Sequence, residues 1–104
     1  MNTLFIDTSS NKEIEVRLKI NRKEYIVKQK IGLQKAQIVL PMIEEILQQN
    51  SINLKDINQI RVNTGPGSFT GLRVGISIAN TLGFFLAVPI NGKKIGQLAQ
   101  PQYK

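Results

Sequence analysis

The chain has 104 residues, a length that suits one domain with a single hydrophobic core. It contains no cysteine and no histidine, which excludes disulfides, zinc sites of the Cys/His type and any histidine general base. Fourteen Lys and Arg against seven Asp and Glu give a formal net charge of +7, and the first residues lack the basic and apolar segments of a secretory signal, so we expect a basic cytoplasmic protein.

Three strands are expected in the first third of the chain. Residues 3–8 read as a strand whose apolar side chains share one face and which ends in a polar turn. Apolar residues alternate with charged ones over residues 13–20, which is the period-two pattern of a half-buried strand. A turn at residues 21–22 leads to a third strand over 23–29, so the sequence predicts a three-stranded antiparallel meander.

From residue 33 the spacing of the apolar residues becomes helical and predicts a helix over residues 34–50. The residues expected to face the core are Ala36, Val39, Leu40, Ile43 and Leu47. Pro41 removes one backbone hydrogen bond, which predicts either a kink in this helix or a helix that starts at Pro41.

The second half of the chain predicts a strand over residues 57–64, a helix over 70–86 and a short strand over 88–90. The start of a further helix over 95–99 and a frayed end over 100–104 are expected to follow. Strands separated by helices require parallel crossover connections. The predicted fold class is therefore α/β, with a mixed sheet in which the antiparallel meander is followed by helix, strand, helix and strand.

The segment Gly65-Pro66-Gly67-Ser68-Phe69-Thr70-Gly71-Leu72-Arg73 forms an elbow between the predicted fourth strand and the second helix. Its glycines let the backbone turn sharply, and Ser68 or Thr70 can cap the helix by accepting one of its first N–H groups. A helix that begins in this way attracts anions. The glycine spacing nevertheless differs from the dinucleotide fingerprint, and no Gly-Lys-Ser/Thr follows to make a Walker loop.

Together with Leu4-Phe5-Ile6-Asp7-Thr8-Ser9 and Val39-Leu40-Pro41-Met42-Ile43-Glu44-Glu45-Ile46-Leu47, this elbow resembles the TsaB (YeaZ) family in order and spacing over residues 1–99. The resemblance implies that residues 1–104 form a single actin-like, ribonuclease-H-like domain, which corresponds to the first half of a family protein. It also implies that the chain is a non-catalytic partner of TsaD and of the other threonylcarbamoylation subunits. TsaD is the enzyme that attaches a threonylcarbamoyl group to the adenosine beside the anticodon in certain tRNAs.

Both predicted helices carry more apolar residues than one packed face needs. On the second helix Val74, Ile78 and Phe85 fall opposite the core stripe with Thr81 between them, and on the first helix Ile38, Met42 and Ile46 lie off the stripe. We predict that these seven residues form an exposed patch for a partner, although they could instead pack within the monomer. The family resemblance implies that the two helices form a bundle with TsaD, or with a second copy of the chain.

No catalytic residue is predicted, because only Asp7 ends a strand where an actin-like fold holds phosphate or metal, and one carboxylate is not a catalytic pair. Lys35 stands where the family often has a lone histidine, and no metal site is expected. The residues that could bind an anion or nucleotide are Asp7, Thr8, Gly67, Ser68 and Thr70, with ATP or ADP held only at a site shared with the partner. The alternative is that these residues form only a helix cap and a strand-end turn.

Three functional hypotheses follow. The first is a scaffold that binds and activates a TsaD-like enzyme and touches tRNA weakly or indirectly. The second is a tRNA-binding module that uses the eight basic residues between Lys12 and Lys35. The third is a homodimer that binds a nucleotide without TsaD. A membrane role is not expected, because polar residues interrupt the uncharged segment over residues 74–90.

Overall fold

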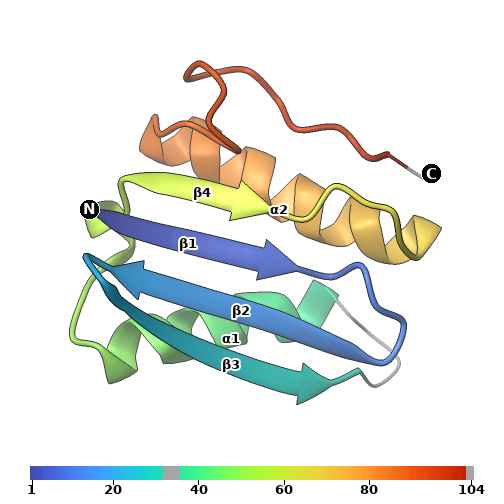
Figure 1. Ribbon diagram of the computed structural model, residues 1–104, viewed down its shortest axis with the longest axis horizontal. Helices are drawn as coiled ribbons and strands as arrows, with labels where there is room; N and C mark the ends of the chain where they lie inside the picture. The colour runs from blue at the N-terminus through green and yellow to red at the C-terminus, as the bar shows by residue number, and fades with distance from the viewer. Residues whose placement is uncertain (32–35, 103–104) are drawn as a thin grey trace.

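A four-stranded mixed sheet organises the fold in the computed structural model, which describes residues 1–31 and 36–102 (Figure 1). The elements are β1 (Asn2–Asp7), β2 (Glu13–Ile20), β3 (Lys23–Lys30), α1 (Ala36–Gln49), the short 3-10 helix η1 (Leu54–Asp56), β4 (Gln59–Val62) and α2 (Phe69–Leu86). The strand order is β3-β2-β1-β4, antiparallel from β1 to β3 and parallel between β1 and β4. The predicted meander and mixed sheet are confirmed.

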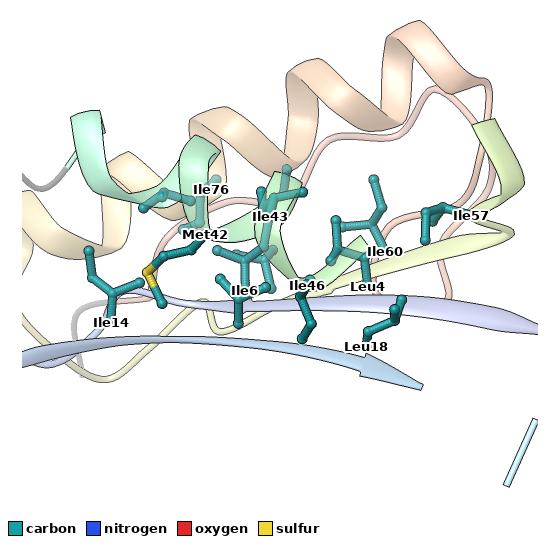
Figure 2. Packing of buried hydrophobic residues seen from close by; sticks show 14 of the residues in the cluster. Leu4, Ile6, Ile14, Leu18, Met42, Ile43, Ile46, Ile57, Ile60 and Ile76 are labelled. Atoms are coloured by element: carbon teal, nitrogen blue, oxygen red, sulfur yellow. The ribbon is translucent and has the colours of Figure 1, made fainter. Parts of the chain in front are cut away.

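Both helices lie on the same face of the sheet. α1 packs on β2 and β3, and α2 packs on β4 and β1. The strands therefore bury alternate side chains against the helices, as Figure 2 shows for Leu4, Ile6 and Leu18. In Figure 1 the strands are drawn in front of α1, so the view looks onto the opposite face of the sheet, which neither helix covers.

The face that α1 turns to the core differs from the predicted one. Its buried residues are Val39, Met42, Ile43, Ile46 and Leu47, whereas Leu40 is 48% exposed. Figure 2 shows Met42 and Ile46 pointing from α1 toward the strands. The prediction that Met42 and Ile46 lie on an outer patch is wrong, because the sheet meets the stripe at i, i+3, i+4 and i+7 counted from Val39.

The helix runs through Pro41, so the alternative start at that residue is also wrong. Ile38 is half-buried and packs against the edge of the core. The predicted first residues of this helix, 34 and 35, lie outside the described residues.

The end of the chain departs most from expectation. The predicted strand over 88–90 is reduced to one parallel bridge between Ile60 and Ile90. Residues 95–99 form no helix, because Gly96 adopts a φ of +91°, which is outside the helical range. The frayed end predicted over residues 100–104 is wrong as far as residue 102, because Ala99 shares two hydrogen bonds with the Asn80 side chain, at 2.9 and 3.0 Å, and Gln102 N–H donates to the Thr64 carbonyl at 2.6 Å. Residues 103 and 104 lie outside the described residues.

Within the described residues, α2 is the one helix whose 18-residue length and mean hydropathy of 1.3 would suit a membrane span. Core helices of soluble proteins pass the same test. Six residues of α2 are buried in the fold: Gly71, Leu72, Gly75, Ile76, Ala79 and Gly83. This burial is the pattern expected of a helix that packs on a sheet.

Candidate functional site

The elbow starts α2 with a side-chain cap. Ser68 is the N-cap residue, and its hydroxyl accepts a hydrogen bond from Gly71 N–H at 3.3 Å. Of the two predicted caps, Ser68 is therefore the one the structure uses. Thr70 lies within the first turn and is exposed. Gly65 needs its lack of a side chain, because its φ is +128°.

We expect Ser68→Ala to lower the free energy of unfolding by about 1 kcal/mol, since the cap hydrogen bond to Gly71 is lost. Urea denaturation would measure the change. Thr70→Ala is the matched control, because Thr70 is exposed on the same helical turn and should change stability by less than about 0.5 kcal/mol. Equal losses in the two variants would contradict the capping role.

The end of β1 is locked to the start of α2 through Thr8. The Thr8 side chain is fully buried, and its hydroxyl donates to the Gly71 carbonyl at 2.5 Å and accepts from Gly75 N–H at 3.0 Å. Gly71 and Gly75 are four residues apart in α2, so the hydroxyl bridges two groups of the same helical turn. Thr8 thus acts as a buried tie between strand and helix.

Asp7 orders the turn that follows β1. Its carboxylate accepts hydrogen bonds from Ser9 N–H at 2.9 Å and from the Ser9 hydroxyl at 2.6 Å. The Ser9 carbonyl in turn accepts from Ser68 N–H at 2.9 Å, and a Cβ on Gly67 would lie 2.7 Å from Ser9 Cβ. The absence of a side chain at Gly67 therefore lets the elbow lie against this turn.

The structure thus brings together the five residues predicted to bind an anion. Thr8 and Ser68 use their hydroxyls to hold the fold, and the Asp7 carboxylate places a negative charge beside the elbow. These contacts favour the capping-and-turn interpretation. An anion would need the N–H groups of the elbow, the exposed Thr70 and a partner that offsets the charge of Asp7.

Residues 1–31 and 36–102 contain no group of three His, Cys, Asp or Glu side chains that could hold a metal ion.

The surface of α2 that points away from the sheet carries the rest of the predicted patch. Val74 and Ile78 are half-buried, Thr81 is exposed and Phe85 is 81% exposed. The Thr81 hydroxyl donates to the Ser77 carbonyl at 2.9 Å, so its hydrogen-bonding capacity is partly used inside the helix. We call these four residues the α2 outer face.

Sequence reasoning missed Phe84, which is also 81% exposed. At 100° per residue it lies on neither the buried stripe nor the α2 outer face. The signal was the pair Phe84-Phe85 near the end of the helix, because adjacent helical residues point in different directions and cannot both face the same surface.

The basic segment forms the β2–β3 hairpin and is partly neutralised. Arg17 pairs with Glu15 and lies 3.6 Å from Glu24, and Lys28 lies 3.6 Å from Glu15. The hydrogen bond to Glu15 is the main cause that raises the pKa of Arg17 above its ordinary value, so Arg17 stays charged throughout the physiological range. Lys35, at the end of the segment, lies outside the described residues.

Comparisons with known proteins agree with this geometry. Residues 21–92 match the family model of TsaD, described as tRNA N6-adenosine threonylcarbamoyltransferase. The chain is 42% identical over 67 residues to the tRNA threonylcarbamoyladenosine biosynthesis protein TsaB of Buchnera aphidicola subsp. Schizaphis graminum, covering 64% of this chain and 32% of that protein. It is 45% identical over 56 residues to TsaB of Escherichia coli, covering 54% of this chain and 24% of that protein.

A solved structure, YeaZ from Pseudomonas aeruginosa, superimposes with a TM-score of 0.82 and 29% identity, covering 89% of this chain and 43% of that one. The predicted actin-like, ribonuclease-H-like fold class is thereby confirmed. The chain spans less than half the length of each of these three relatives.

Proposed function

This chain belongs to the TsaD family and to its TsaB (YeaZ) group, and from that premise we propose that it is a non-catalytic scaffold subunit in the threonylcarbamoylation of tRNA. In this proposal the chain binds a TsaD-like enzyme and stabilises its active conformation in the cytoplasm. The names of the TsaB relatives support the pathway, and the α2 outer face supports the mode of action.

The single observation that carries the proposal is the position of Phe85. A phenylalanine that is 81% exposed lies on the same side of α2 as half-buried Val74 and Ile78. Aromatic and aliphatic side chains that group on a helix face mark protein contacts, because burying them against a partner removes apolar surface from water. Ile38 on α1 is half-buried against the same core, and we propose that its exposed part also contacts the partner.

In this proposal the partner supplies the chemistry. The chain has no histidine or cysteine to serve as base, nucleophile or soft metal ligand. Any ATP or ADP would bind at a site completed by the TsaD-like protein, where partner cations could offset the Asp7 carboxylate beside the elbow. A second copy of the chain could use the same apolar face when the enzyme is absent.

We expect Phe85→Asp to weaken the complex with the TsaD-like protein of the same genome at least about thirtyfold, because an interface would have to bury a carboxylate where it now buries a ring. Ile78→Asp should act in the same direction. Size exclusion with light scattering would show whether each variant still co-elutes with the enzyme.

Phe84→Asp is the matched control, since Phe84 has the same side chain and the same 81% exposure but lies off the α2 outer face. It should leave co-elution intact. If Phe85→Asp and Phe84→Asp bind the enzyme as tightly as the parent chain, the scaffold surface does not lie on this face. Circular dichroism of every variant separates lost binding from lost folding.

A further inference from the structure

A hollow lies on the face of the sheet that neither helix covers, the face turned to the viewer in Figure 1. Its volume is about 520 Å³, and its lining includes Phe5, Arg17, Lys19, Glu24 and Arg61. These residues come from all four strands, because the pairing places Phe5 beside Arg17 on one side and beside Arg61 on the other. The sequence alone did not bring them together.

The charge of this hollow is predominantly positive. Arg17, Lys19 and Arg61 contribute three cations, whereas Glu24 is the one carboxylate in the lining. Glu24 already lies 3.6 Å from Arg17. Within residues 1–31 and 36–102, neither Lys19 nor Arg61 has an ion-pair partner. Lys19 lies two residues from Arg17 on β2, and Arg61 lies on β4, on the other side of Phe5. Two cations without an ion-pair partner beside a paired arginine suit a ligand that carries more than one negative charge.

Two flat side-chain groups lie together in the hollow. The Arg17 guanidinium lies over the Phe5 ring, 5.3 Å from its centroid, and its hydrogen bond to Glu15 fixes its position. An aromatic ring and a guanidinium plane are the two groups on which proteins stack unpaired nucleobases. Phe5 lies on β1, inside the sheet and rigidly paired on both sides, so the platform is already ordered before a ligand arrives.

We propose that this hollow binds single-stranded RNA. A base stacks on the Phe5–Arg17 pair, and the phosphates on either side of it contact Lys19 and Arg61. Because cations outnumber carboxylates in the lining, the hollow suits the phosphates of RNA better than the apolar surface of a protein partner. This site lies on the opposite side of the sheet from α2, so it does not depend on the scaffold proposal and extends it by giving the chain a direct RNA contact.

The test is fluorescence anisotropy with a labelled 12-nucleotide oligoadenylate and the full chain. Lys19→Glu and Arg61→Glu are each expected to weaken binding at least about tenfold, and Phe5→Leu at least about fivefold through lost stacking. Arg61→Ala should also flatten the slope of log K against log salt by about 0.7, the value for one lost phosphate contact on a single strand. Lys94→Glu is the control, because it makes the same change of charge at an exposed site outside the hollow.

Several results would overturn the proposal. Lys94→Glu could weaken binding as much as Arg61→Glu, which would make the effect one of net charge. AMP could compete as strongly as the oligonucleotide does, which would make the hollow a mononucleotide site. Lys19→Glu and Arg61→Glu could abolish co-elution with the TsaD-like protein while RNA binding stays unchanged, which would make the hollow a protein interface.

The scaffold proposal and the RNA proposal can fail separately, because Phe85→Asp is expected to leave oligoadenylate binding within about twofold of the parent chain. Circular dichroism again serves as the check on folding. Lys19→Gln, which removes the cation without adding a carboxylate, keeps the test informative if Lys19→Glu does not fold.

Discussion

Ile46→Ala is expected to lower the free energy of unfolding by about 2–5 kcal/mol, the range for emptying a fully buried aliphatic site. Ile46 is 0% exposed and points from α1 toward the sheet in Figure 2. The loss combines the transfer of three carbon atoms out of the core with the cavity that the sheet cannot close. Urea denaturation followed by circular dichroism measures it directly.

This variant also separates a core residue from an interface residue. Ile46→Ala should make the isolated chain unfold at a lower urea concentration. Phe85→Ser, at an 81% exposed position of α2, should change the free energy of unfolding by less than about 0.5 kcal/mol. An Ile46→Ala variant with unchanged stability and lost partner binding would instead return Ile46 to the interface.

Gly75→Ala is expected to lower the free energy of unfolding by about 2–4 kcal/mol, although alanine in a helix is normally about 1 kcal/mol better than glycine. A Cβ at position 75 would overlap the Thr8 hydroxyl and lie 3.2 Å from Thr8 Cγ2. The methyl group would therefore displace Thr8 and break its buried hydrogen bonds to Gly71 and Gly75. Unsatisfied buried polar groups and overpacking together exceed the gain in helix propensity.

A double-mutant cycle tests the mechanism. Thr8→Ala removes the atoms that the new methyl group would meet, so Gly75→Ala should cost less in that background than in the parent chain. Ser77→Ala on the exposed side of the same helix is the control and should be nearly neutral. Independent, additive effects of Thr8→Ala and Gly75→Ala would show that the tie does not operate as described.

The two faces of the protein would serve two different partners. The helix side carries the apolar α2 outer face, where a protein partner gains by excluding water. The bare sheet side carries Phe5, Arg17, Lys19 and Arg61, where a polyanion gains by pairing with cations. A subunit with both surfaces could hold an enzyme and its RNA at once, which the variants Phe85→Asp and Arg61→Glu probe one at a time.

The sequence by itself determined the local elements. Alternation over residues 13–20 defined β2, and the mostly apolar helical run defined α2, with Ser68 as one of two candidate caps. Strand period, helix period and capping all depend on residues close together in the chain. The motifs in and after β1, in α1 and at the elbow were enough to identify the family that the chain resembles.

Only the tertiary structure decided which stripe of α1 is buried, since Met42 and Leu40 are both apolar and the sheet selects between them. The same holds for the Thr8 tie, whose partners Gly71 and Gly75 are more than sixty residues away. It also holds for the tail held by Asn80 and for the hollow, in which strand pairing places Phe5 between Arg17 and Arg61. Contacts between distant segments carry no periodic signal, so only the packing of the folded chain determines them.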